Sequence, residues 1–235
     1  MPQNRFFIDA PFEKGKTVTF PPSEKHHLTV MRCKINDQVE LINGRNQLAR
    51  ATILSLTTDS AELEINDIHT AEAPNVTVNL YQAFCHYNRL DTILEKCVEL
   101  GASGFYLFSS SLSEIKIPAN RDHRLKKVIT SAMKQCGRLD LPKLHLLKKM
   151  DAIEKPKGLT FFGDIRENSE YLTKAFSKNN SYNIFIGPEK GFTAKEIQFL
   201  ENSFEAKGIH LHPNILRTDT AAICFLSQLQ LLIHS

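Results

Sequence analysis

The feature that most constrains the fold is a regular alternation of short apolar runs and amphipathic stretches after residue 75. The apolar runs predict strands covered on both faces of a sheet, and they lie at Val76–Phe84, Gly104–Ser109, Leu159–Phe162, Tyr182–Ile186 and Ile209–Leu211. The stretches between them predict helices. The first has an apolar stripe at Leu90, Ile93, Leu94, Cys97 and Val98. Further helices are expected at Arg121–Cys136, after the capping box Thr193–Glu196, and at Thr220–Ile233. This alternation indicates an α/β fold whose mainly parallel sheet lies between helices.

Residues 1–72 have a different pattern. Short strands separated by turn residues are expected at Val18–Phe20, Gln38–Ile42, Leu48–Leu56 and Ser60–Ile68. Asn43-Gly44 is a tight-turn signal, and Ser23 is the expected N-cap of a helix that continues through Met31. The pattern predicts a compact β-barrel, and the polar, proline-marked segment Ala71–Asn75 places a domain boundary between residues 72 and 73.

Composition excludes several classes of protein. No apolar run approaches the roughly 20 residues that cross a bilayer, and the first 15 residues lack the charged and apolar regions of a signal peptide. The five cysteines contain no Cys-x-x-Cys pair, so we expect buried free thiols in a reducing cytoplasm rather than disulfides or zinc ligands. His26-His27 has no nearby partner for a metal, and the sequence therefore predicts no metal site and no membrane contact.

Charge is unevenly distributed along the chain. Residues 1–73 hold 8 basic and 10 acidic residues, whereas residues 116–157 hold 12 basic and only 4 acidic ones. Such a basic excess is suited to a nucleic-acid backbone. It is equally typical of a solvated face, and charge alone leaves both interpretations open.

Three loops carry the candidate functional residues, because ligands of parallel sheets bind at the carboxyl ends of strands. They are Gly187–Phe192, His212–Thr220 and Gln135–Arg138. Each has a structural alternative: a strand-to-helix turn for the first, a helix cap at Thr218 or Asp219 for the second, and a helix C-terminus for the third. Arg217 has no evident packing role, which makes it the strongest functional candidate. The usual dinucleotide, P-loop, nucleophile-elbow and zinc-protease motifs are missing from the sequence.

Four motifs in order resemble a known family. They are Lys96–Gly101 (KCVELG), Ala132–Arg138 (AMKQCGR), Ile186–Phe192 (IGPEKGF) and Ile215–Ala221 (ILRTDTA). Together they are similar to the bacterial RNA methyltransferases that form 3-methyluridine in 16S ribosomal RNA. That family belongs to the SPOUT class, so the resemblance implies a trefoil-knotted α/β methyltransferase domain at 73–235. The segments Arg5–Asp9 and His26–Asn46 resemble the family's N-terminal PUA-like β-barrel, which implies an RNA-binding domain at 1–72.

The resemblance also implies S-adenosylmethionine as cofactor, a homodimer, and 16S ribosomal RNA or the small ribosomal subunit as partner. The implied cofactor residues are Gly187, Pro188, Glu189, Gly191, Leu211, Ile215, Leu216, Thr218, Thr220 and Ala221. The implied catalytic residues are Arg217, Arg138 and Glu189. The implied RNA-binding residues are Arg5, His27, Arg32, Arg89, Arg124, Lys127 and Lys134.

The expected chemistry is methyl transfer to uridine N3, which must lose its proton. A guanidinium beside the uracil oxygens stabilises the developing anion, which is the role expected of Arg217, whereas the proton acceptor stays open between Glu189, Asp219 and hydroxide. The family usually has glycine at the position of Lys190, and it has a different sequence at His212–Asn214. These departures leave two alternatives: an RNA-binding protein with impaired catalysis, or a SPOUT methyltransferase acting on another RNA nucleotide.

Overall fold

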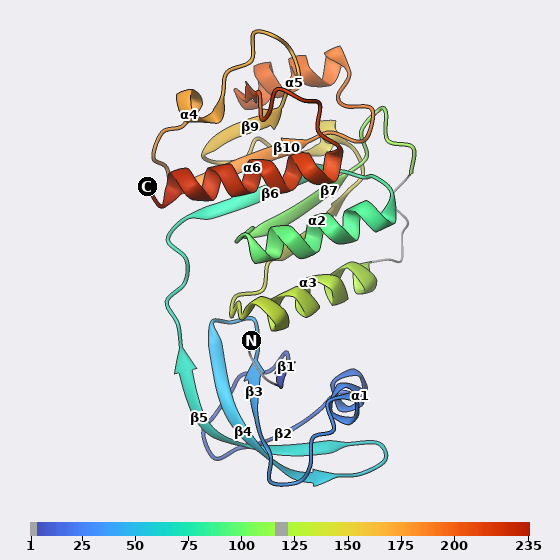
Figure 1. The fold of residues 1–235 in the computed structure, drawn as a ribbon, viewed down its shortest axis with the longest axis vertical. Helices are drawn as coiled ribbons and strands as arrows, with labels where there is room; N and C mark the ends of the chain where they lie inside the picture. Colours follow the sequence, from blue (N-terminus) through green and yellow to red (C-terminus); the bar gives the residue numbers. More distant parts are fainter. Residues whose placement is uncertain (1–3, 116–121) are drawn as a thin grey trace. The chain divides into compact units, whose positions relative to one another are not determined.

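A computed structural model describes residues 4–115 and 122–235 (Figure 1). The chain forms two compact units, which are described separately. Unit 1 runs up to Ala73 and also takes Thr130–Leu141, whereas unit 2 comprises Pro74–Ile129 and Pro142–Ser235. Two basic residues of the predicted RNA-binding segment, Lys116 and Arg121, lie outside the described residues.

Unit 1 contains a five-stranded sheet with one short helix, α1 (Pro22–Val30). The strands lie in the order β1-β3-β4-β5-β2 and comprise β1 (Arg5–Phe7), β2 (Thr17–Thr19), β3 (Gln38–Ile42), β4 (Gln47–Leu56) and β5 (Ala61–Thr70). β1 pairs with β3 in parallel, and the other pairs are antiparallel. The predicted alternation is confirmed, since Ala61, Leu63 and Ile65 are all buried in one core.

The start of α1 differs from the sequence prediction. The helix begins at Pro22 with Pro21 in the N-cap position, so Ser23 lies inside the first turn and is not the N-cap. Proline explains the shift, because its fixed φ suits the first helical position and its missing N–H costs nothing there.

The predicted turn at Asn43-Gly44 is confirmed as the start of the connection between β3 and β4. The Asn43 side chain accepts a hydrogen bond from the Arg45 N–H at 2.9 Å, which closes an Asx turn. Gly44 has φ +73°, and a Cβ at this position would lie 2.7 Å from Leu141 Cβ. Because Leu141 N–H donates to the Gly44 carbonyl at 3.0 Å, glycine is required where the returning segment 130–141 contacts this loop.

Unit 2 is built on a parallel sheet, as predicted, and the sheet has six strands. The strands lie in the order β11-β9-β10-β6-β7-β8 and comprise β6 (Thr77–Ala83), β7 (Gly104–Phe108), β8 (Lys143–Leu147), β9 (Leu159–Gly163), β10 (Ser181–Ile186) and β11 (Lys207–Ile209). β10 lies between β9 and β6, although it follows both of them in the sequence. Its carboxyl end is therefore central, next to the ends of β6 and β9.

Helices cover both faces of this sheet. The main ones are α2 (Tyr87–Glu99), α5 (Ala194–Phe204) and α6 (Thr218–Ile233), with short helical turns at η1 (Met150–Ala152) and α4 (Leu172–Ala175). α3 (Asp122–Cys136) begins in unit 2 and ends in unit 1. α2 and α6 lie side by side (Figure 1). Phe225 of α6 contacts Phe161 on one face of β9, at 6.2 Å between ring centroids, whereas Phe204 of α5 contacts Phe185 of β10 at 5.5 Å. The buried stripe predicted for α2 is confirmed at all five positions.

Two strands of the unit 2 sheet differ from the sequence prediction. β11 ends at Ile209 rather than reaching Leu211, because its partner β9 ends at Gly163, which pairs with Ile209. β8 was not predicted, since Lys143 and His145 interrupt its apolar pattern, as is usual for an edge strand with one exposed side. The prediction of buried thiols holds for Cys85 and Cys97 but is wrong for Cys136, which is exposed at the end of α3. No helix within residues 4–115 and 122–235 is both long and apolar enough to cross a membrane.

Candidate cofactor pocket

A pocket of about 260 Å³ lies at the carboxyl ends of β9 and β10 and the start of α6. That volume is close to the lower end of the range of about 300–1,000 Å³ found for small-molecule sites. Nine of the ten predicted cofactor residues line it: Gly187, Pro188, Glu189, Gly191, Leu211, Ile215, Leu216, Thr218 and Ala221. The tenth, Thr220, is exposed on α6 and is not among the lining residues.

The loop after β10 is a tight turn made possible by two glycines. Gly191 has φ +73° and donates from its N–H to the Pro188 carbonyl at 2.9 Å. A Cβ on Gly187 would lie 3.1 Å from the Gly191 carbonyl carbon, so the two ends of the turn approach each other as only glycine permits. The predicted capping box then starts α5, with Thr193 as N-cap and Glu196 as its reciprocal partner.

The start of α6 forms the opposite side of the pocket. Arg217 is the N-cap residue and Thr218 the first helical residue, so the helix begins two residues earlier than predicted and neither Thr218 nor Asp219 is its N-cap. The Thr218 hydroxyl donates to the Gly187 carbonyl at 2.6 Å, which ties α6 to the loop after β10. Arg217 is exposed, and within the described residues no hydrogen bond or ion pair engages its guanidinium.

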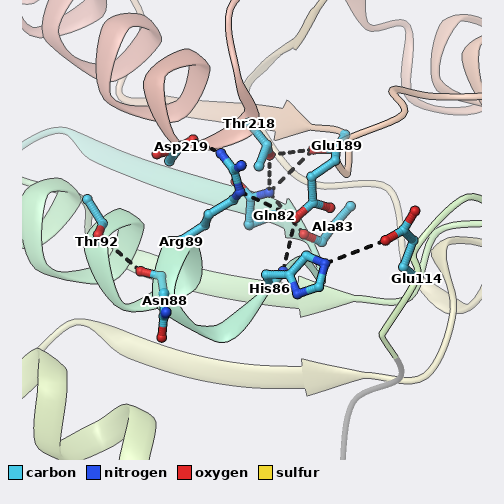
Figure 2. A network of polar contacts seen from close by, with 11 residues as sticks. Gln82, Ala83, His86, Asn88, Arg89, Thr92, Glu114, Glu189, Thr218 and Asp219 are labelled. Atoms are coloured by element: carbon cyan, nitrogen blue, oxygen red, sulfur yellow. Dashed lines mark hydrogen bonds and ion pairs between the residues drawn. The ribbon is translucent and has the colours of Figure 1, made fainter.

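Two carboxylates beside the pocket are held by one arginine (Figure 2). Arg89 of α2 donates to Asp219 at 3.0 Å, and its Nε lies 3.8 Å from Glu189. Glu189 also accepts a hydrogen bond from the His86 N–H at 3.0 Å. Burial, together with these two carboxylates, raises the pKa of the neighbouring Cys85 thiol to about 12, so this cysteine is not a nucleophile at neutral pH.

Lys190 and His212, two of the residues that depart from the family pattern, line the pocket and each make a polar contact there. The Lys190 ammonium pairs with Glu114 at 2.9 Å, and Glu114 also lies 3.5 Å from the His86 ring (Figure 2). His212 is exposed, and its Nδ1 accepts a hydrogen bond from the Asn214 N–H at 3.0 Å. Both side chains are therefore engaged at the rim. The described part of the chain holds no group of histidine, cysteine or acidic residues arranged for a metal ion.

A third loop of the pocket was missed by the sequence reasoning. Gly163, the last residue of β9, and the following Asp164 and Ile165 line the cavity. Burial alone would raise the pKa of Asp164, but hydrogen bonds from Arg166 and Ser169 outweigh it and hold that pKa below its usual value. The sequence does contain a signal for this loop, because Gly163-Asp164 directly follows the predicted apolar strand Leu159–Phe162. Parallel sheets bind ligands at such positions.

The predicted RNA-binding residues of the N-terminal segment differ in their availability. Arg5 donates twice to Glu40, at 3.0 and 2.6 Å, and its side chain is largely buried. The His27 ring packs on Phe6 at 4.9 Å between ring centroids. Arg32 is exposed and has a left-handed backbone conformation, with φ 56°.

The basic residues around α3 are partly neutralised by carboxylates. Lys134 pairs with Glu24 at 2.7 Å within unit 1, and Arg124 pairs with Asp91 within unit 2. Lys127 is exposed. The predicted catalytic Arg138 belongs to unit 1, where it forms a two-pronged pair with Asp140 at 2.8 and 2.6 Å. These ion pairs make the net positive charge around α3 smaller than the composition of residues 116–157 predicts.

The chain matches two family definitions in the order expected from its folds. Residues 20–66 match an RNA methyltransferase PUA domain, and residues 71–230 match an RNA methyltransferase domain. The second match covers most of the chain and includes all three pocket loops. The chain belongs to the RNA methyltransferase family.

Similar proteins cover nearly the whole length of this family member. It is 25% identical over 240 residues to ribosomal RNA small subunit methyltransferase E of Rickettsia conorii, with 99% of this chain and 97% of the relative covered. It is 27% identical to the protein of the same name from Bacillus subtilis, with 95% and 94% covered. A crystal structure of the Neisseria gonorrhoeae ribosomal RNA small subunit methyltransferase E bound to S-adenosyl methionine has a TM-score of 0.90, 26% identity and 98% coverage of both chains.

Proposed function

We propose that this protein transfers a methyl group from S-adenosylmethionine to N3 of a uridine in 16S ribosomal RNA. The observation that carries the proposal is the pocket formed by the loops after β9 and β10 and the start of α6 in an RNA methyltransferase domain. The Neisseria relative, which holds S-adenosyl methionine, supports the cofactor, and the names of the Rickettsia and Bacillus relatives support the small-subunit RNA.

The residues present fit this cofactor. Because Gly187 and Gly191 have no side chains, the backbone groups of the loop after β10 can approach a ligand closely. Leu211, Ile215 and Leu216 supply apolar walls for an adenine ring. When bound, S-adenosylmethionine supplies an electrophilic methyl group, and no metal is needed for its transfer.

Arg217 is the catalytic residue in this proposal. The reaction forms a bond between N3 and the methyl carbon, breaks the bond between that carbon and sulfur, and releases the N3 proton. Negative charge therefore develops on the uracil oxygens, where a guanidinium placed in advance is most effective. Arg217 is suited to this task because its side chain is exposed at the start of α6 and has no partner among the described residues.

The proton leaves to hydroxide or water rather than to a pocket carboxylate. Asp219 and Glu189 both lie beside Arg89, and Glu189 also accepts a backbone hydrogen bond. Both carboxylates are thus already engaged in contacts that hold the loop after β10 and the start of α6 against α2. Glu189, predicted as catalytic, therefore acts by holding the loop after β10 in place, and positioning supplies much of the acceleration.

We extend the proposal to the architecture around the pocket. Residues 73–235 form a trefoil-knotted SPOUT domain, residues 1–72 form a PUA-like barrel that holds RNA, and two copies assemble as a homodimer in the cytoplasm. The insertion of β10 between β6 and β9 supports the knot. Ile215, just before α6, and Leu231, near the end of α6, are apolar side chains that are 80% and 70% exposed, which supports a subunit interface on this part of unit 2.

Two measurements test the proposed function. Calorimetry with S-adenosylmethionine should show one site per chain. The purified protein should convert one uridine of 16S RNA to 3-methyluridine in small subunits from cells that lack the enzyme, with nucleoside mass spectrometry as the readout. Cofactor binding without methylation of that RNA would refute the proposal, and a methyl group on another nucleotide would correct the target.

A further inference from the structure

One buried polar side chain lies at the junction of the pocket elements without lining the pocket. Gln82, near the end of β6, is fully buried. Its side-chain Nε2 donates to the Thr218 hydroxyl at 3.0 Å and to the Ala83 carbonyl at 2.9 Å, and lies 3.5 Å from the Gly187 carbonyl (Figure 2). The amide therefore joins β6 to two segments that lie more than 100 residues later in the sequence.

The direction of these hydrogen bonds is fixed. An amide nitrogen can only donate, so the Thr218 oxygen accepts from Gln82 and its own proton must go to another acceptor. That acceptor is the Gly187 carbonyl, at 2.6 Å. The relay from Gln82 through Thr218 to Gly187 thus sets both the orientation of the Gly187 peptide and its distance from the first turn of α6.

Stability does not explain an amide at this position. The Gln82 Oε1 atom is buried and has no hydrogen-bond partner within the described residues. A buried unsatisfied carbonyl is unfavourable, and an apolar residue of similar volume is often tolerated equally well or better. Such local conflicts are expected at functional positions.

We propose that Gln82 is a positioning residue that holds the loop after β10 and the start of α6 at the spacing S-adenosylmethionine requires. The inference rests on the proposed function. It assigns Gln82 no contact with the cofactor, because the side chain acts through Thr218 and Gly187.

The test compares Gln82→Leu and Gln82→Met with the unaltered full-length protein. We expect the dissociation constant for S-adenosylmethionine, measured by calorimetry, to rise about tenfold, since loss of one neutral hydrogen bond is worth up to about one factor of ten. The melting temperature should stay within about 3 °C, because the change replaces an unsatisfied amide with an apolar group. In steady-state assays the KM for the cofactor should rise more than kcat falls.

Thr218 provides the second arm of the test. Thr218→Val keeps the shape but removes the hydroxyl, and should weaken cofactor binding like the Gln82 variants, whereas Thr218→Ser should restore it. Combining Gln82→Leu with Thr218→Val should weaken cofactor binding little more than either change alone, because both interrupt the same relay of hydrogen bonds.

Asn183 of β10 is the matched control. It is a fully buried amide in the neighbouring strand, accepting from Asn79 at 3.1 Å and donating to the Lys157 carbonyl at 2.8 Å. Asn183→Leu should lower the melting temperature and leave the dissociation constant unchanged. If the Gln82 variants instead behave like this control, the positioning role is refuted. If the unaltered protein does not bind S-adenosylmethionine, the proposed function itself fails.

Discussion

Replacing Glu196 should destabilise the protein through one buried carboxylate. Glu196 lies in the first turn of α5 and accepts four hydrogen bonds. They come from the Ser110 hydroxyl, the Ser111 N–H, and the N–H and hydroxyl of Thr193, all at 2.8 Å. The carboxylate therefore both closes the capping box and fastens the loop after β7 to α5.

The magnitude follows from the groups that would lose their acceptor. In Glu196→Ala the two hydroxyls can rotate toward other partners, but the N–H groups of Thr193 and Ser111 cannot. Leaving a partly buried N–H unsatisfied costs about 1–3 kcal/mol, so the two together predict a loss of about 3 kcal/mol. For a chain of this size that corresponds to a fall in melting temperature of about 6–12 °C.

The pH dependence provides an independent readout. Burial alone would raise the pKa of Glu196, but the hydrogen bonds from Ser111, Thr193 and Ser110 outweigh it, so the folded pKa lies below the ordinary value. The stability that the ionised carboxylate contributes is complete above the unfolded pKa of about 4.3. It is lost as pH falls through the lowered folded pKa. The difference between the unaltered protein and Glu196→Ala should therefore be largest near neutral pH and narrow in acid.

Thermal unfolding followed by circular dichroism measures both effects. The control is Glu201→Ala, which removes an exposed carboxylate from the same helix together with its surface pair to Arg166, a change worth about 1 kcal/mol at most. A loss below about 1 kcal/mol in Glu196→Ala, or a difference that does not change with pH, would refute the reasoning.

Three further predictions concern other residues. Arg217→Ala should reduce kcat by about 100-fold or more, as expected for a group that stabilises developing charge, with little change in melting temperature, and a large thermal effect would favour a packing role instead. Alkylation followed by mass spectrometry should label the exposed Cys136 well before Cys85, because Cys85 is buried and its pKa is raised to about 12; equal labelling would contradict this burial. Gly158→Ala should lower the melting temperature, since Gly158 has φ +91° and a Cβ there would meet the Ser181 backbone, and an unchanged melting temperature would show that the turn can relax.

Local sequence signals predicted the elements well where short-range physics decides them. The α2 stripe and the Thr193–Glu196 capping box depend on contacts within one or two turns of helix, so spacing alone locates them. The start of α1 shows the limit of such signals, because Ser23 and Pro22 both mark a helix start and the proline geometry prevailed. The Gly187–Phe192 turn was found for the same reason, through its glycines.

Hydrophobic periodicity could not predict contacts between residues that are distant in sequence. Nothing in the pattern of residues 130–141 indicates that they join unit 1, since that depends on Leu141 meeting Gly44. The charge pairs of Arg89 likewise join α2 to residues about 100 or more positions away, so a side chain predicted to bind RNA is engaged within the protein. Gln82 was not predicted because a polar residue within a mostly apolar strand gives no periodic signal of a functional role.

The late insertion of β10 has a consequence for the order of assembly. β10 pairs with β6, and Thr77 of β6 is synthesised about 100 residues before its partner Ser181 of β10. One side of β6 therefore stays unpaired while the intervening chain emerges from the ribosome. Non-local parallel pairing is intrinsically slow, because loop closure precedes the contacts that reward it. A nascent chain that stops short of residue 186 would expose the backbone groups of β6 and β9 to other chains, which makes translation pausing in this interval a point of vulnerability to aggregation.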